Sequence, residues 1–412
     1  MMTRQAVILV GGKGTRLGAL ASSTPKPLMA IGGDMVFLDA LLLEIVRHGF
    51  DDILLLAGHL HEKIRERYCG RSIRGASLRV VVESGPAGTA GALRNAASLL
   101  DSTFLLANGD TLFDINLRRL SACLETRPDV LGVLALRRES DSTRYGSVRL
   151  QDGYVVAFRE KESGREPAFI NAGVGVFRRE MSTFVEETPC SMELDVYPRL
   201  AAARTILGEV FDGYFIDIGT PESLRKARLD LANRRRPAVF FDRDGVLNHD
   251  AGYCHRVDAL EWTRGAVETI RLVNEAGALA IVVSNQAGVA HGLFCEADID
   301  RFHAEMSTQL AAAGAHIDAF YFCPYHPDAA VAEWRHPDHP DRKPNPGMIR
   351  RALAEWPIDM NSSLLIGDKA SDMEAARRAG IRGILFQGGD LYASTRSELE
   401  HVVALRSRTR MC

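Results

Sequence analysis

Apolar runs alternate with stretches of helical period twice along this chain. In the first half, runs typical of strands lie at 7–10, 53–57, 79–82 and 103–107, and helical stretches lie between them at 36–48, 60–67 and 89–100. From Ala238 the pattern restarts, with strands near 279–283, 318–322, 363–366 and 382–386 and helices near 265–275, 297–313, 346–355 and 371–378. Alternation of this kind predicts parallel sheets with helices on both faces. We therefore expect an α/β protein of two doubly wound domains, residues 1–233 and 238–412.

The pattern changes between about residue 130 and the end of the first domain. Expected strands follow one another at 130–137, 146–150, 154–158 and 169–177, before expected helices at 179–186 and 193–203. Successive strands without helices between them predict an antiparallel lobe added to the first sheet. A helix over 221–233, capped by Thr220 and opened by Pro221, ends this domain.

Charge and composition exclude several classes of function. The 412 residues carry a net charge of −3, with no basic stripe that would favour nucleic acid. No run approaches the roughly 18 apolar residues of a membrane span. The first residues lead directly into a strand, and the seven cysteines form no CxxC pair. We expect a cytoplasmic protein with reduced thiols that binds neither nucleic acid nor membrane. The oligomeric state stays open, including a homo-oligomer.

A glycine-rich turn, VGGKGTRL, follows the first strand. Gly11, Gly12 and Gly14 let backbone N–H groups face an anion, and Arg16 adds a permanent positive charge. Lys26 lies between two prolines and is presented from a stiff segment. The spacing fits neither a Walker loop nor a dinucleotide fingerprint. A phosphate cradle is the prediction, and a tight turn with surface cations is the alternative.

Two acids stand where such a cradle needs a metal ion. Asp110 follows the strand in FLLANGD, and Asp217 lies in GYFIDIGTP. Ligands of open α/β sheets bind at the carboxyl ends of strands, and carboxylate oxygens suit Mg²⁺. A helix cap is the alternative for an isolated aspartate at a strand end.

The strings GGKGTRL, PKPL, GTAGAL, NGD, RYG, NAG and FIDIGTPE resemble, in order across residues 5–232, the sugar-phosphate nucleotidyltransferases. FDINL and DGYFIDIGTPE are most similar to the D-glycero-α-D-manno-heptose 1-phosphate guanylyltransferases. The resemblance implies that Gly11, Gly12 and Arg16 hold the nucleoside triphosphate, that Lys26 neutralises the attacking sugar phosphate, and that Asp110 and Asp217 hold Mg²⁺. It further implies base contacts from Glu83 and Gly88, and sugar contacts from Gly146, Glu160, Lys161 and Asn171. Another base, or mannose 1-phosphate as substrate, stays open.

The second domain begins with FFDRDGV, in which Asp242 and Asp244 end an apolar strand. Extended geometry places both side chains on one side of the chain, about 7 Å apart. One carboxylate can attack phosphorus while the other protonates the leaving oxygen and later activates water.

With SNQAG at 284–288, RKP at 342–344 and GDKASDM at 367–373, this string resembles the haloacid dehalogenase phosphatases. The resemblance implies that Asp242 is the nucleophile and Asp244 the acid/base. Ser284, Asn285 and Arg342 would bind substrate, Lys343 would balance phosphoryl charge, and Asp242, Asp244 and Asp368 would hold Mg²⁺. Asp372 could merely cap the following helix. The short connections imply a haloacid dehalogenase-like Rossmannoid domain without a large cap.

NHDAGYCHRVD and CPYHP resemble the heptose 1,7-bisphosphate 7-phosphatases, with histidinol-phosphate phosphatases as the nearest rival. That branch often carries a zinc loop, Cys-x-His followed by Cys-x-Cys. This chain has Cys323-x-Tyr325 and then His339-x-Asp341, so only the first ligand is kept. We expect no zinc.

The two resemblances point to consecutive steps. Removal of the 7-phosphate from heptose 1,7-bisphosphate gives the heptose 1-phosphate that a guanylyltransferase would join to GTP. The expectation is a bifunctional enzyme with Mg²⁺ in both domains. The alternatives are a different sugar 1-phosphate nucleotidyltransferase fused to a histidinol-phosphate-like phosphatase, and one domain acting as a silent regulatory module.

Overall fold

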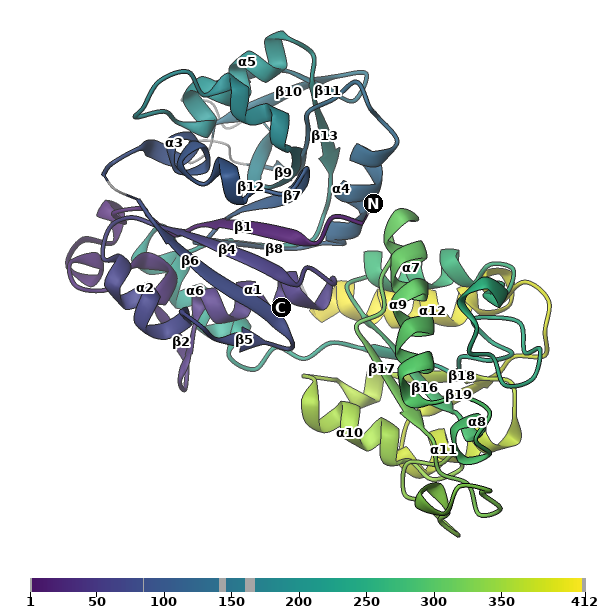
Figure 1. Ribbon diagram of the computed structural model, residues 1–412. Helices are drawn as coiled ribbons and strands as arrows, with labels where there is room; N and C mark the ends of the chain where they lie inside the picture. Colours follow the sequence, from purple (N-terminus) through teal and green to yellow (C-terminus); the bar gives the residue numbers. More distant parts are fainter. Residues whose placement is uncertain (1, 84, 141–145, 160–166, 410–412) are drawn as a thin grey trace. The chain divides into compact units, whose positions relative to one another are not determined.

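A computed structural model describes residues 2–83, 85–140, 146–159 and 167–409. The chain divides into two compact units, Met1–Asn233 and Arg234–Cys412. Each unit has its own sheet and its own helices (Figure 1). Within the described ranges, no helix has both the length and the apolar character needed to cross a membrane.

The first unit is built on a ten-stranded sheet in the order β10-β11-β13-β9-β12-β7-β1-β4-β6-β5. Its centre, β7-β1-β4-β6, is parallel throughout, as the alternating pattern predicts. The strands are β1 (Gln5–Leu9), β4 (Asp52–Ala57), β5 (Ser72–Ile73), β6 (Ala76–Val82), β7 (Thr103–Asn108), β9 (Gly132–Glu139), β10 (Ser147–Gln151), β11 (Tyr154–Arg159), β12 (Ala168–Arg178) and β13 (Ile206–Val210). Two small antiparallel sheets complete the unit. The first is a hairpin of β2 (Ala30–Gly32) and β3 (Met35–Val36), and the second pairs β8 (Thr111–Asp114) with β14 (Tyr214–Asp217), which is distant in the chain.

The added lobe departs from the antiparallel arrangement that we expected. Most of its pairings are antiparallel, but β13 lies parallel to β9. The connection from β12 to β13, which runs through helical turns and α5 (Tyr197–Ala202), reverses the chain, so β13 runs opposite to β12 and in the same direction as its neighbour β9. In addition, β10 pairs with both β11 and β12, so the five strands of the lobe close into a ring.

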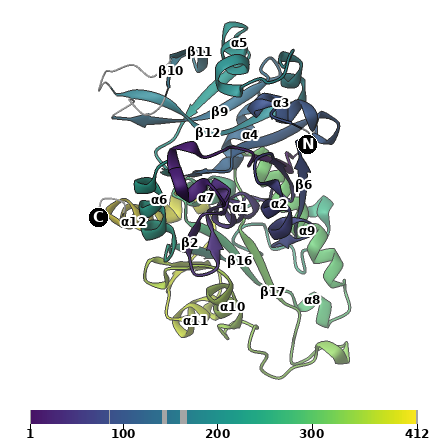
Figure 2. The same cartoon turned by 90° about the vertical axis from the view of Figure 1, so that its left-hand side faces the viewer.

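Helices cover both faces of this sheet (Figures 1 and 2). On one face lie α1 (Phe37–Arg47), α2 (His61–Tyr68) and α4 (Leu117–Glu125), whose apolar side chains share one buried cluster. On the other face lie α3 (Gly88–Asn95) and α5, which share a second cluster. The last helix, α6 (Pro221–Leu231), starts at the predicted cap, where Thr220 Oγ1 accepts a hydrogen bond from Ser223 N.

The second unit has a five-stranded, entirely parallel sheet in the order β17-β16-β15-β18-β19. The strands are β15 (Ala238–Phe241), β16 (Leu279–Asn285), β17 (Ala319–Cys323), β18 (Leu364–Gly367) and β19 (Arg382–Leu385). One face is covered by α7 (Ala266–Glu275), α9 (Glu296–Ala312) and α12 (Leu391–Thr409), and the other by α10 (Gly347–Glu355) and α11 (Ala370–Ala379). The short helix α8 (Ala287–Ala290) follows β16.

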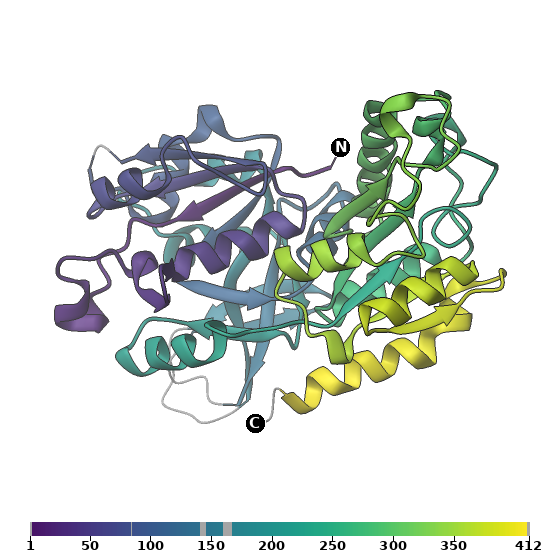
Figure 3. The same ribbon diagram turned by 90° about the horizontal axis from the view of Figure 1, so that it is seen from below.

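Helix α12, the yellow helix that leads to the C-terminus in Figure 3, was not expected from the sequence. It is held by buried apolar residues such as Leu391 and Leu399, which pack in the same cluster as Ile270 of α7. In both units the predicted acids follow the carboxyl ends of neighbouring strands. Asp110 follows β7, and Asp242 and Asp368 follow β15 and β18.

Candidate active sites

The glycine-rich turn after β1 borders a cavity of about 440 Å³. A Cβ on Gly11 would lie 2.8 Å from Glu83 Oε1 and 3.0 Å from Gly58 N, so a side chain there would displace Glu83 or shift the Gly58 backbone. A Cβ on Gly12 would meet nothing within 4 Å, and Gly12 lines the open side of the cavity. The turn therefore presents bare backbone to whatever occupies this space.

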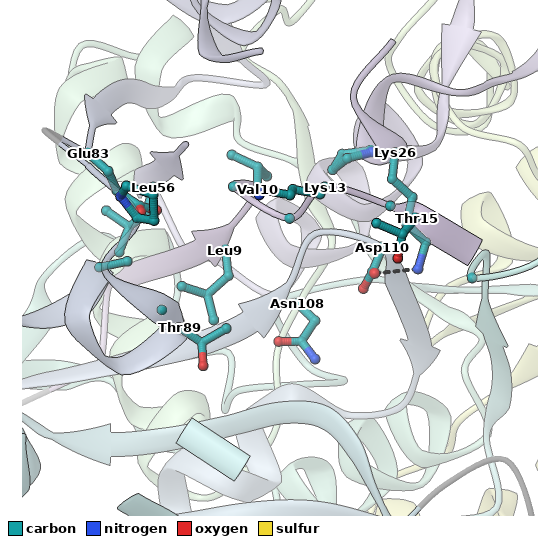
Figure 4. Close-up of a pocket in the computed structure, with 18 of the residues that line it drawn as sticks. Leu9, Val10, Lys13, Thr15, Lys26, Leu56, Glu83, Thr89, Asn108 and Asp110 are labelled. Atoms are coloured by element: carbon teal, nitrogen blue, oxygen red, sulfur yellow. Dashed lines mark hydrogen bonds and ion pairs between the residues drawn. The ribbon is translucent and has the colours of Figure 1, made fainter. Parts of the chain in front are cut away.

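Lys26 joins the two acids predicted to hold a metal ion. Its buried ammonium contacts Asp110 Oδ2 (Figure 4) and lies 3.2 Å from Asp217 Oδ1. Asp217 Oδ1 also accepts a hydrogen bond of 2.5 Å from Gly219 N. The two carboxylates thus meet around one cation, and a set of carboxylate oxygens this close suits a hard divalent cation such as Mg²⁺.

Arg16 belongs to the same group of charges. A Cβ on Gly219 would lie 3.3 Å from Arg16 Nη2 and 3.3 Å from Lys26 Nζ, so both cations face this glycine. The two cations and the two acids therefore form one charged group beside the glycine-rich turn.

The predicted base contacts, Glu83 and Gly88, both line the 440 Å³ cavity, and burial raises the pKa of Glu83. The predicted sugar contacts Gly146 and Asn171 line a second cavity of about 670 Å³. Glu160 and Lys161 lie outside the described residues. The two cavities share three lining residues, Arg16, Asn108 and Glu193.

In the second unit, Lys343 holds the predicted nucleophile. Its ammonium lies 2.8 Å from Asp242 Oδ1 and 2.6 Å from Asp372 Oδ1, and it donates to Val283 O at 2.9 Å. Burial raises the pKa of Asp242 to about 6 although the charge of Lys343 opposes the rise. Asp372 is more than a helix cap, because it receives the Lys369 N–H and also contacts Lys343.

Asp244 is held by hydrogen bonds to both carboxylate oxygens. Arg243 donates from Nε to Oδ1 and from Nη2 to Oδ2, at 3.0 and 2.9 Å. Asn248 Nδ2 donates to Oδ1 at 3.0 Å and Gln286 Nε2 to Oδ2 at 2.8 Å. Burial alone would raise the pKa of Asp244, but the charge and hydrogen bonds of Arg243 prevail and lower it.

A metal ion fits beside Asp242. Carboxylate oxygens of Asp242, Asp368 and Asp372 all lie within 4.8 Å of one another, and Asp368 Oδ1 is buried without a hydrogen-bond partner in the described chain. A buried, unpaired oxygen facing other carboxylates is costly unless a cation balances it. Asp244, which was also predicted as a ligand, is not in this group.

The predicted phosphate-binding residues have specific partners. Asn285 accepts from Lys343 N at 3.0 Å and donates to Lys343 O at 3.1 Å, so it fixes the backbone that carries the lysine. Ser284 Oγ accepts from Gln286 Nε2 at 2.8 Å. Arg342 donates to Tyr325 O at 3.0 Å and is half-buried.

The altered zinc loop does not offer a zinc site. Cys323 Sγ lies 3.8 Å from His339 Nδ1, but Tyr325 stacks on that ring at 3.9 Å, in the position where the zinc branch has histidine. Asp341 pairs with Arg351 at 3.0 Å. These side chains do not fit the metal, and we derive no step through it.

Comparison with known proteins agrees with this division. The family model for nucleotidyl transferases matches residues 5–234, more than half of the chain. The chain belongs to the nucleotidyl transferase family. A HAD-hydrolase-like model matches residues 341–405 of the second unit. The protein is therefore an enzyme with a nucleotidyl transferase unit and a phosphatase unit.

Three similar proteins illustrate the two halves. A D-glycero-beta-D-manno-heptose-1,7-bisphosphate 7-phosphatase of Rhodopseudomonas palustris is 44% identical over 158 residues, 38% of this chain and 87% of the relative. HddC from Yersinia pseudotuberculosis is 28% identical over 56% of this chain and 99% of its own, with a TM-score of 0.49. A structure described as a glucose-1-phosphate thymidylyltransferase of Bacillus anthracis, at 18% identity and a TM-score of 0.50, covers 55% of this chain and 94% of its own. That last likeness shows the nucleotidyl transferase fold.

Two wall residues of the nucleotidyl transferase unit were missed by sequence reasoning. Asn108 stands two positions before Asp110 in NGD, where only the aspartate drew attention. Glu193 lies in a stretch expected to be an ordinary helix, but the segment begins with a π-helical turn, Met192–Val196. The role of Asp372 in the phosphatase unit was left open between a helix cap and a site residue. Its spacing of four residues after Asp368, on the strand-to-helix turn, is the sequence feature that could have indicated the site.

Proposed function

We propose that this enzyme makes a GDP-heptose in two steps. The phosphatase unit removes the 7-phosphate of D-glycero-D-manno-heptose 1,7-bisphosphate, and the nucleotidyl transferase unit joins GMP from GTP to the heptose 1-phosphate. The carrying observation is the fusion of a nucleotidyl transferase unit to a unit 44% identical to a heptose-bisphosphate 7-phosphatase along 87% of that relative. The choice of guanine is supported by the FDINL and DGYFIDIGTPE strings.

In the phosphatase unit, the Asp242 carboxylate attacks phosphorus and the bond to the sugar oxygen breaks. The Asp244 carboxylate, whose pKa is lowered, takes up a proton and exchanges one of its four donors for that oxygen, which it protonates as the bond breaks. It then takes a proton from the water that splits the aspartyl phosphate. Asp242 and Asp368, with Asp372 beside them, would hold Mg²⁺, which would neutralise charge on the phosphoryl group. The substrate is enclosed by loops, without a large cap.

In the nucleotidyl transferase unit, an oxygen of the sugar phosphate attacks the α-phosphorus of GTP, and pyrophosphate leaves with the electron pair of the broken bond. Lys26 and Arg16 balance the charge of the two phosphate groups as they approach, and the glycine turn donates backbone N–H groups. Asp110 and Asp217 would hold Mg²⁺, which would add to this neutralisation. Catalysis here is positioning and electrostatics, with no covalent intermediate.

The test is incubation of the full chain with heptose 1,7-bisphosphate, Mg²⁺ and GTP, followed by mass spectrometry of the products. The expected products are phosphate, pyrophosphate and GDP-heptose. Parallel reactions with ATP, UTP, CTP and dTTP, with mannose 1-phosphate, and with histidinol phosphate test the alternatives. Faster turnover of any of these than of the heptose substrates and GTP would overturn the assignment.

A further inference from the structure

Glu193 lies on the wall between the two cavities of the nucleotidyl transferase unit. It shares this place with Arg16 and Asn108. The next residue, Leu194, and Pro198 line the larger cavity but not the smaller one. Its segment therefore faces mainly the cavity that also contains Asn171.

The backbone of the π-helical turn fixes the point from which the Glu193 side chain extends. Glu193 is the second residue of the π-helical turn, whose first and last residues, Met192 and Val196, are buried at 1% and 0% exposure. Single π-turns occur often at functional sites, because the extra residue turns side chains into a new direction. With both ends buried, the turn directs Glu193 and Leu194 outward.

The turn is also docked on the start of α3, at the smaller cavity. Cys190 N donates to Ala87 O at 2.8 Å, Cys190 O accepts from Ala90 N at 2.9 Å, and Met192 N donates to Thr89 Oγ1 at 2.8 Å. A Cβ on Gly88 would lie 2.3 Å from Cys190 O, so this approach requires glycine. Glu193 is thereby held at a fixed place relative to the nucleotide cavity.

The carboxylate itself is only weakly engaged. Oε2 accepts from Thr89 Oγ1 at 3.5 Å and from Ser191 Oγ at 3.4 Å, the long limit for a hydrogen bond. None of the ion pairs found in the described part of the chain includes Glu193. A carboxylate accepts hydrogen bonds only and repels phosphates, so the substrate groups that suit it are donors, either sugar hydroxyls or N–H groups of the base.

We propose that Glu193 selects the sugar by accepting hydrogen bonds from ring hydroxyls of the sugar 1-phosphate in the 670 Å³ cavity. The inference rests on the proposed function of the first unit and adds a specificity-determining residue to it. The position of Leu194 and Pro198 favours the sugar over the ribose of the nucleotide as the hydrogen-bond donor.

The test compares Glu193→Ala and Glu193→Gln with wild type in pyrophosphate release. A matched control is Glu187→Gln, an exposed acid before the π-turn that lines neither cavity. Loss of a charged hydrogen-bond acceptor predicts a KM for sugar 1-phosphate about 10- to 100-fold higher in Glu193→Ala, with a smaller rise in Glu193→Gln. The KM for GTP and the rate of phosphate release from the second unit stay within threefold of wild type.

Monodeoxy sugar 1-phosphates sharpen the test. For one of these analogues, the wild-type enzyme has a lower kcat/KM than for the complete sugar phosphate, because the missing hydroxyl is the partner of the Glu193 carboxylate. In Glu193→Ala that partner is already lost, so the same analogue and the complete sugar phosphate have nearly equal kcat/KM. An unchanged KM for the sugar phosphate, or equal rises for sugar phosphate and GTP, overturns the inference. A wild type that releases pyrophosphate from no pair of sugar phosphate and nucleotide overturns the proposed function instead.

Discussion

Replacement of Lys343 by methionine tests the electrostatic design of the phosphatase unit. The change keeps an unbranched chain but removes an ammonium that lies within 2.8 Å of oxygens from two acids. Both acids, Asp242 and Asp372, are buried at 5% and 0% exposure. Breaking a buried ion pair by removing one partner costs about 3–5 kcal/mol, because a charge is left without compensation. We expect the free energy of unfolding of this unit to fall by about that amount at pH 7.

The loss depends on pH with a definite sign. Burial already raises the pKa of Asp242 to about 6 against the opposing charge of Lys343, and Lys343→Met removes that opposition. At pH values above the ordinary pKa of aspartate, Asp242 keeps its proton in the folded variant, whereas Asp242 in the unfolded chain has lost it. Its stability therefore falls as pH rises, and its deficit relative to wild type shrinks from pH 7 toward pH 5.

Urea unfolding followed by tryptophan fluorescence measures this directly. The chain has three tryptophans, Trp262, Trp334 and Trp356, and all belong to the second unit. The experiment uses a chelator, and added Mg²⁺ restores part of the lost stability by neutralising the same acids. Arg377→Met removes an exposed ion pair and serves as the control without a measurable shift. Equal urea midpoints for Lys343→Met and wild type at pH 7 would refute the reasoning.

Three further predictions follow from the two sites. Asp242→Asn abolishes phosphate release but leaves nucleotidyl transfer from heptose 1-phosphate, and Asp110→Asn does the reverse; loss of both activities in either variant contradicts two separate sites. Burial and the charge of Arg243 lower the pKa of His303 to about 3, so the second unit loses up to about 1.4 kcal/mol per pH unit as pH falls below 6.5. In the same fluorescence assay, His303→Gln removes this change of unfolding free energy with pH. Identical slopes for wild type and His303→Gln below pH 6.5 would contradict the prediction. Chelator-washed protein retains no stoichiometric zinc by elemental analysis, and one zinc per chain would disprove this. Cys323 reacts slowly with thiol reagents at pH 8 because burial raises its pKa to about 11.

The acids of both sites could be placed from the sequence because apolar runs reveal where strands end. Asp110 and Asp242 lie directly after such runs, and the structure has strands there. The partners of Lys26 could not be derived in this way, since they are 84 and 191 residues away in the chain. The tertiary fold brings these segments together. β7, which precedes Asp110, pairs with β1, and β14, which ends at Asp217, pairs with β8.

Local irregularities explain what sequence patterns missed. The π-turn at 192–196 adds one residue to a helical repeat, which hides the direction of Glu193 from any count based on 3.6 residues per turn. The parallel entry of β13 depends on the connection before it, and strand composition does not encode direction. The ring stack of Tyr325 on His339 likewise depends on a loop whose backbone has no repeating pattern.

The common wall of the two cavities has a kinetic meaning. Because Arg16 and Asn108 border both spaces, donor and acceptor can be resident together, each touching the other's boundary. We expect transfer inside a ternary complex, so double-reciprocal plots for the two substrates intersect rather than run parallel.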